Sequence, residues 1–409
     1  MASRYESDYS RNSELFQGYL ADPLAMGAPE RRYPVLQVAG SEWLGSASLG
    51  RGPEHDDAGL LVRHSGLTLA AVPLAWQLQG QATHLEPREE GIGNYALTSP
   101  LVGLGVGVRP TDRLSLLLLH NQDTARVAYP QGLDLGSSQV DGPARQRWRR
   151  TEAGGAWRWS ANEQTWFKWH RSSAGQSLQL QNHIIGPQES RITDTDQSVQ
   201  LRHTLQRGAR RLGLGWEHSR TGASSAIGDA VSVYDVSTRA RFDMPWLAYE
   251  DSSGPWTWHA QASWPRLRVD WLNRSYDPST GRDELAPLRD GGVVARRTLP
   301  RLGLAYRWGP GRALHAAYIE STRGIGANTL APVAVGAIPI DFHYQLPGAF
   351  ARKSALQLDW ELDARSFALL ALSRQEIANP TYASDGSLLV PVQTLSQFDR
   401  VQGLGPQVQ

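Results

Sequence analysis

Apolar and polar side chains alternate strictly along parts of this chain. From Trp256 to Trp264 every even position is Trp or Ala, and the odd positions between them are Thr, His, Gln and Ser. Successive side chains of a β-strand point to opposite faces, whereas a helical period of 3.6 would carry both kinds of side chain around every face. The segment is therefore predicted to be a strand with one apolar and one polar face.

Four other segments show the same alternation. They are 212–217, 267–271, 302–308 and 356–361. A barrel that spans a membrane turns the apolar face of each strand to lipid and the other face to the lumen. The pattern therefore predicts an all-β fold, an antiparallel transmembrane β-barrel, in which we expect at least 12 strands.

Compact polar segments separate the predicted strands and act as candidate turns. They are 109–112, 160–163, 207–210, 264–266, 309–312 and 362–365. Their spacing of roughly 50 residues corresponds to two spanning strands and one long loop. Longer segments rich in Gly, Pro and polar residues, without alternation, are predicted to be the loops: 121–145, 173–195, 275–292 and 322–350. Short turns at one rim and long loops at the other are typical of outer-membrane barrels.

Composition supports this interpretation and excludes several function classes. The chain has 15 Trp, 40 Gly and 24 Pro but no Cys, which excludes disulfides, thiolate nucleophiles and Cys-ligated metals. The net charge of +1 argues against a nucleic-acid partner, which would require a basic excess. A mean hydropathy of -0.42 is compatible with a barrel, because half of the side chains of each spanning strand are polar.

The two ends of the chain differ from its middle. Residues 1–32 are predicted to be a linker or short helix that precedes the barrel, and residues 33–409 to be the barrel itself. The first residues contain no apolar run, so a leader for export would lie outside them. The chain stops after one strand beyond the last candidate turn, and we expect the barrel to be truncated at one or both ends, including the C-terminus.

Two strand–turn–strand units, 302–314 and 356–369, resemble those of large Gram-negative outer-membrane barrels. The segment containing Leu330-Ala331-Pro332-Val333 and Leu346-Pro347-Gly348 is similar to loops of barrels fused behind tetratricopeptide arrays, or of TonB-dependent-receptor-like barrels. The resemblance implies an outer-membrane location, transport, and a periplasmic domain or partner upstream. Few residues precede the barrel where a receptor would have its plug, which favours an export channel, for example for a polysaccharide.

Two rival functions follow from the same pattern. A non-transporting barrel would use its loops as an adhesin or as a surface scaffold. A soluble propeller of the kelch type also has a period of about 50 residues, but its Gly-Gly signature occurs here only at 154–155 and 291–292. We do not expect an enzyme, since the segment around His170 and Ser172 matches no catalytic motif. No cofactor or metal is expected, and the cargo is not specified.

Strand parity assigns two groups of candidate residues. The predicted lumen-facing residues, which would set ion selectivity or pair with one another across strands, are Arg158, Lys168, Arg202, Arg268, Asp270, Arg307, Gln357, Asp359 and Glu361. The predicted membrane-interface aromatics are Trp159, Trp169, Trp256, Trp264, Trp308 and Trp360. The expected partner of the aromatic side chains is outer-membrane lipid.

Overall fold

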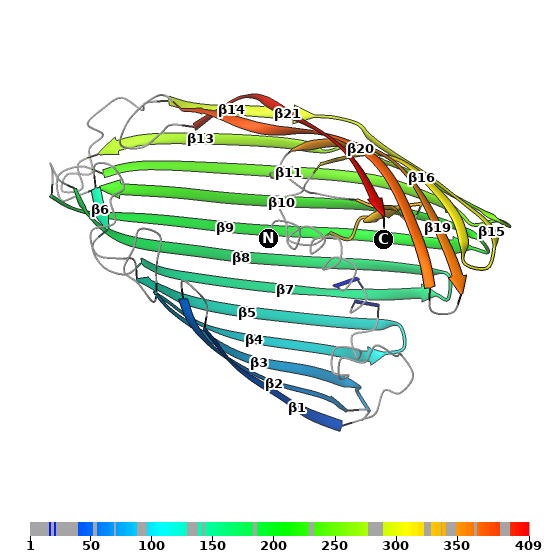
Figure 1. Cartoon of the computed structure of the whole chain (residues 1–409), viewed down its shortest axis with the longest axis horizontal. Coiled ribbons are helices and arrows are strands. Elements are labelled where there is room, and N and C mark those ends of the chain that lie inside the picture. Colours follow the sequence, from blue (N-terminus) through cyan, green and yellow to red (C-terminus); the bar gives the residue numbers. More distant parts are fainter. Residues whose placement is uncertain are drawn as a thin grey trace.

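The computed structural model of the chain consists almost entirely of one antiparallel sheet (Figure 1). It describes residues 16–17, 20–21, 40–51, 55–68, 71–87, 96–128, 138–140, 144–182, 186–228, 233–276, 289–322, 329–336, 338–340, 349–363, 366–384 and 393–408. Within these ranges, no helix has the length and apolar character needed to cross a membrane.

Each strand of the wall pairs with its neighbour along the chain. The strands are β1 (Gly40–Arg51), β2 (His55–Thr68), β3 (Leu74–Pro87), β4 (Ala96–Thr111), β5 (Leu114–Ala128), β7 (Ala144–Ser160), β8 (Glu163–Asn182), β9 (Gly186–Arg207), β10 (Arg210–Gly228), β11 (Val233–Asp251), β12 (Trp256–Ser263), β13 (Arg266–Tyr276), β14 (Arg289–Arg296), β15 (Leu299–Gly309), β16 (Arg312–Thr322), β19 (Phe350–Asp363), β20 (Ser366–Ser384) and β21 (Gln393–Val408). The short β6 (Ser138–Val140) pairs with the end of β8.

β12 and β13 form one continuous strand of the wall. Trp246 of β11 lies opposite Ser263 of β12, and Asp243 lies opposite Arg266 of β13, so the register does not shift between them. The pairing is interrupted at Pro265, which has no N–H to donate. β14 and β15 continue one another in the same way. The wall therefore has 16 strands, which confirms the predicted antiparallel barrel of at least 12.

The sheet curves around a lumen on its concave side (Figure 1). β1 and β21 are the first and last strands of the wall, and no pairing joins them among the described residues. The predicted turns 109–112, 160–163, 207–210 and 309–312 all join neighbouring strands. The predicted turn at 264–266 is wrong because it lies within the continuous strand; β11 and β12 are joined instead at 252–255, where Gly254 has a φ of 64°.

Strands extend into segments that the sequence predicted to be loops. β8 and β9 pair as far as Asn182 and Gly186, so the predicted loop at 173–195 is almost entirely strand. β5 likewise runs to Ala128, eight residues into the predicted loop 121–145. Within 275–292, residues 277–288 lie outside the described residues. Except for β16, which has 11 residues, the wall strands are thus longer than the 9–11 residues that cross a membrane.

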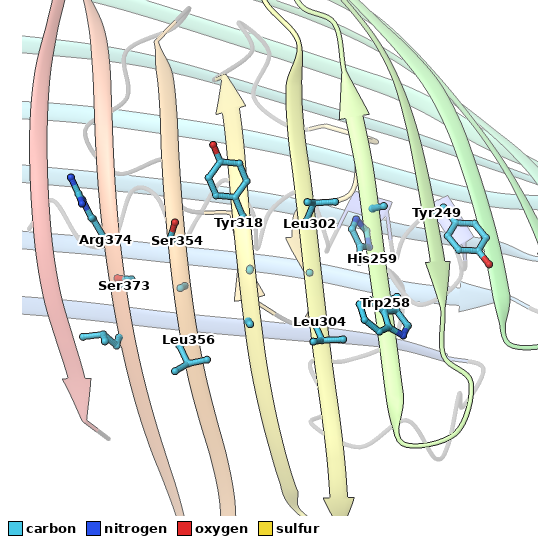
Figure 2. A pocket seen from close by; sticks show the side chains of 16 residues that line it. Tyr249, Trp258, His259, Leu302, Leu304, Tyr318, Ser354, Leu356, Ser373 and Arg374 are labelled. Carbon is cyan, nitrogen blue, oxygen red and sulfur yellow. The ribbon is translucent and has the colours of Figure 1, made fainter.

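The outer face of the wall carries an apolar band. On β15, the outward Leu302 and Leu304 alternate with the buried Arg301 and Gly303. Figure 2 shows side chains of this band on neighbouring strands, where Leu304 lies beside Trp258 of β12 along an apolar groove. This arrangement matches the lipid-facing surface that the alternation predicts.

Candidate functional site in the barrel lumen

A segment between β16 and β19 folds into the lumen, and we call its residues 329–340 the inner segment. Its middle is a small hairpin of β17 (Ala334–Val335) and β18 (Ile338–Pro339), closed by a hydrogen bond from the Ile340 N–H to the Val333 carbonyl oxygen at 2.8 Å. Gly336 turns the hairpin with a φ of 56°, which a glycine adopts without strain. The inner segment lies within the predicted surface loop 322–350, so that prediction is wrong for these residues.

Polar side chains of β9 and β10 hold the first residues of the inner segment. The Gln200 side-chain oxygen accepts a hydrogen bond from the Leu330 N–H at 2.6 Å. Arg202 donates to the Leu330 carbonyl oxygen at 3.3 Å, and the Thr329 hydroxyl donates to Glu217 at 3.2 Å. Because Gln200 and Arg202 bind backbone groups of Leu330, they fix the path of the segment at this residue whatever its side chain is.

β15 and β16 hold the hairpin of the inner segment. Arg301 donates to the Pro332 carbonyl oxygen at 3.2 Å, and a ring nitrogen of His315 lies 2.8 Å from the Gly336 carbonyl oxygen. Gly303 allows the close approach, because a Cβ on it would lie 2.6 Å from the Gly336 nitrogen. Ile319 of β16 packs against the hairpin in one apolar cluster. The inner segment is therefore fastened to four strands of the wall, β9, β10, β15 and β16.

A helical turn near the N-terminus completes the filling of the lumen. Gln17 donates to the Thr329 carbonyl oxygen at 2.8 Å and accepts from Arg202 at 2.9 Å. Phe16 and Leu20 are buried against Leu330 in one apolar cluster. These residues belong to the predicted linker 1–32, and the structure places them inside the lumen rather than outside the wall.

Charged side chains of the inner wall gather around Glu152 of β7. Its carboxylate lies 2.9 Å from Arg150, 3.2 Å from Lys168 and 3.5 Å from His170. His170 also lies 3.5 Å from Asp196. The Glu152 side chain is 5% exposed and the Lys168 side chain is 0% exposed, so the cations and the carboxylate compensate one another away from water. No group of three or more acidic and histidine side chains able to hold a metal is found within the described ranges.

Most of the predicted lumen-facing residues lie on the inner face. Lys168 and Arg202 take part in the contacts above, and Arg158 and Arg307 each follow a buried alanine of the inner face by two positions. Asp359 lies 3.0 Å from His315 and accepts a hydrogen bond from Gln357 at 2.8 Å. Glu361 continues the same face of β19. The Lys168 pairing fits the alternative that inward charges pair across strands, while a role in ion selectivity stays a prediction.

The assignment of Arg268 and Asp270 to the lumen is wrong. The Arg268 side chain is 53% exposed and pairs with Asp270 at 3.0 Å on the outer face. Their neighbours Leu267 and Val269 are buried on the inner face, in a cluster with Ala331 of the inner segment. The parity assumed that apolar side chains always face lipid, but here the apolar face of β13 packs inward on the inner segment.

The predicted interface aromatics lie on the outer face. Trp159, Trp256, Trp264, Trp308 and Trp360 are exposed, and Trp169 is half-buried. At the short-turn rim the Tyr306 ring lies between two of them, with centroids 4.3 Å from Trp256 and 6.1 Å from Trp308. Their contact with lipid headgroups stays a prediction.

Sequence reasoning missed the apolar inner face of β11. Phe242, Met244 and Trp246 alternate with outward residues and are buried with Ala331. The available signal was the composition of the inner segment, where Leu330, Val333, Val335, Ile338 and Ile340 give an apolar content that is high for a surface loop. An apolar segment of this kind requires an apolar wall to pack against.

The sheet resembles the barrels of solved transport receptors. It superposes on the unliganded ferric citrate transporter FecA with a TM-score of 0.65 and 13% identity, covering 92% of this chain and 56% of that one. The fold is that of a TonB-dependent receptor barrel. This receptor-type barrel is also similar to the ferric yersiniabactin uptake receptor FyuA of Yersinia pestis, with a TM-score of 0.63 and 11% identity, covering 91% of this chain and 58% of that one. It is similar to the copper transporter OprC as well, with a TM-score of 0.62 and 10% identity, covering 93% of this chain and 61% of that one.

The receptor-type barrel is recognised through its structure and not through its sequence. No protein-family model matches the chain, and no curated protein sequence matches it. The chain spans 56% of the length of the ferric citrate transporter and 58% of the yersiniabactin receptor. The similarity agrees with the predicted outer-membrane location. The predicted relation to barrels behind tetratricopeptide arrays stays a prediction.

Proposed function

We propose that this receptor-type barrel is the wall of a gated outer-membrane transporter, and that the inner segment is its gate. The observation that supports the proposal most directly is that backbone groups from Leu330 to Gly336 are hydrogen-bonded to wall side chains on β9, β15 and β16. The Thr329 hydroxyl adds a hydrogen bond to Glu217 on a fourth strand, β10. A lumen filled in this way requires that the inner segment and the turn around Gln17 move before a solute can pass.

The direction of transport that we propose is uptake. The structures that the barrel resembles are named for ferric citrate, ferric yersiniabactin and copper, all of them small metal-containing solutes. The polar inner face, with Arg202, Glu217 and Gln200 behind the inner segment, would give such a solute charged and hydrogen-bonding groups once the gate opens. A periplasmic partner of the TonB kind would supply the energy for that movement.

Planar-bilayer conductance tests the gate. The full chain, refolded in detergent and inserted, is expected to give no steady open steps, whereas a variant with residues 329–340 replaced by a Gly-Ser linker of the same length is expected to give discrete steps. Replacement of residues 277–288, also twelve residues between neighbouring wall strands, is the matched control and should stay silent.

The same recordings separate transport from the rival function as a non-transporting scaffold. An inserted linker variant that remains silent would remove the support for a gate and favour a barrel whose lumen has a structural role. Steady steps from the unmodified chain would show that the inner segment does not close the lumen.

A further inference from the structure

Arginines of four wall strands stand in one row on the outer face. Arg220 of β10 lies directly opposite Arg241 of β11, and Arg241 lies directly opposite Arg268 of β13. On the other side, Gln197 separates Arg220 from Arg171 of β8. All four arginines are exposed, and we call them the basic row.

The basic row lies just beyond the apolar band, on the side of the long connections. Four residues back along the strands, Trp216 of β10 stands opposite Pro245, whose carbonyl oxygen accepts from the Trp264 N–H at 3.0 Å. Trp256, at the short-turn rim, is eight residues from Trp264. Eight residues of a strand tilted by about 40° rise about 20 Å, close to the height of the apolar band of such barrels, which is about 25 Å. Trp216 and Trp264 therefore mark the edge of the lipid.

The four residues from this edge to the basic row correspond to about 10 Å along the membrane normal. This distance places the guanidinium groups at the level of lipid headgroups, outside the hydrocarbon. Further exposed arginines on the outer face of the same part of the wall are Arg147, Arg149, Arg191, Arg239 and Arg266. Acidic side chains among them are Glu189, Asp243 and Asp270. The basic surplus favours an anionic partner at this level.

The pairing of the row is unfavourable for the protein alone. Like charges directly opposite one another in an antiparallel pair are destabilising, and here three arginines follow one another across three neighbouring strands. Arg268 has the Asp270 carboxylate at 3.0 Å, but the row itself, Arg, Gln, Arg, Arg and Arg, contains no carboxylate. An anion bridging neighbouring guanidinium groups would turn this repulsion into charge-assisted hydrogen bonds.

We propose that the basic row binds the phosphate groups of a phosphorylated glycolipid of the outer leaflet, while the apolar band beneath it contacts the acyl chains. The proposal requires only that the wall is inserted in the membrane, and it is independent of whether the lumen transports a solute. Arginine suits the task because its planar fork donates two parallel hydrogen bonds to a phosphate.

Binding of diphosphoryl lipid A to the full chain, refolded in a nonionic detergent, tests the proposal by native mass spectrometry. The triple variant Arg220→Gln, Arg241→Gln, Arg268→Gln should bind at least about tenfold more weakly, since several charge-assisted hydrogen bonds are lost. The matched control is Arg113→Gln, Arg207→Gln, Arg210→Gln at the short-turn rim, which should bind like the unmodified chain. Dephosphorylated lipid A should bind the unmodified chain as weakly as diphosphoryl lipid A binds the triple variant.

The melting temperature provides a second readout, because the difference between the triple variant and the unmodified chain should change sign when lipid A is added. Without lipid A the triple variant should melt at a higher temperature than the unmodified chain, because the repulsion is gone; with lipid A it should melt at a lower one. Equal lipid binding by the two chains overturns the proposal. If inorganic phosphate raises the melting temperature of the unmodified chain as much as lipid A does, the lipid is overturned as the ligand of the basic row. If the triple variant gives no folded band, Arg241→Gln alone should weaken binding by about threefold or more.

Discussion

The charge cluster around Glu152 predicts that removing its carboxylate lowers the stability of the protein more than removing one of its cations. Glu152→Gln removes the one carboxylate that lies within 3.5 Å of Arg150, Lys168 and His170. The change keeps the shape of the side chain but leaves the buried Lys168 and the partly buried Arg150 without this countercharge. Lys168→Met also keeps the approximate shape, yet it leaves Glu152 with Arg150 at 2.9 Å and His170 at 3.5 Å.

The magnitudes follow from burial and from the number of remaining partners. Breaking a buried ion pair by removing one partner costs about 3–5 kcal/mol, and we expect Glu152→Gln to fall in this range. Loss of one hydrogen bond to a charged group costs about 1.5–3 kcal/mol, which is the range for Lys168→Met. The double variant should cost less than the sum, because removing Lys168 also removes one uncompensated cation.

Urea unfolding in lipid vesicles, followed by tryptophan fluorescence, measures these differences. At a slope of about 2 kcal/mol per molar urea, the two single variants should have midpoints about 1 M apart, with Glu152→Gln the lower. A Lys168→Met midpoint equal to or below that of Glu152→Gln would refute the assignment of Glu152 as the centre of the cluster. The electrostatic explanation would also be refuted if the two single losses simply added in the double variant.

Three further predictions concern the gate, the outer face and a turn. Gly303→Ala places a Cβ 2.6 Å from the backbone of the inner segment and should open the lumen, seen as new conductance steps, whereas Gly309→Ala, with free space around it, should not. In vesicles the Cys-free chain allows single labels: Arg268→Cys should react with a membrane-impermeant maleimide, and Leu304→Cys, in the apolar band, should be protected. Gly254→Ala should lower the free energy of unfolding by about 1 kcal/mol, because its φ of 64° disfavours a Cβ although no neighbour is touched.

Period-two patterning predicted the parts of the wall that lie in the apolar band. In a membrane-spanning wall the two faces of a strand have different surroundings, lipid outside and the lumen inside, which accounts for alternation such as that of the outward Leu302, Leu304 and Tyr306. Beyond the band this constraint disappears. From Ser173 to Gln179 the strand consists mostly of small and polar residues, with Leu178 as the one large apolar residue, which is why its sequence looks like a loop although it pairs with β9.

The candidate site was less predictable because its contacts are distant in sequence. Parity alone assigned Lys168 and Arg202 to the inner face, but nothing local in the sequence shows that Arg202 would contact Leu330. Arg268 was misplaced for the same reason: the inward packing of Leu267 depends on Ala331, a residue of another segment. Because of this tertiary packing, the apolar face of β13 points into the lumen and not outward as its parity predicted.

The contacts that fill the lumen join residues far apart along the chain, and this separation has a consequence for the order of folding. Leu330 and Gln200 are 130 residues apart, and Gln17 and Thr329 are 312 residues apart. Hairpins between neighbouring strands close short loops and form early, whereas contacts at such separation require the intervening chain to be in place first. We therefore expect the packing of Gln17 against Thr329 to be among the last events of assembly, so that a chain with an incomplete wall keeps an unfilled lumen.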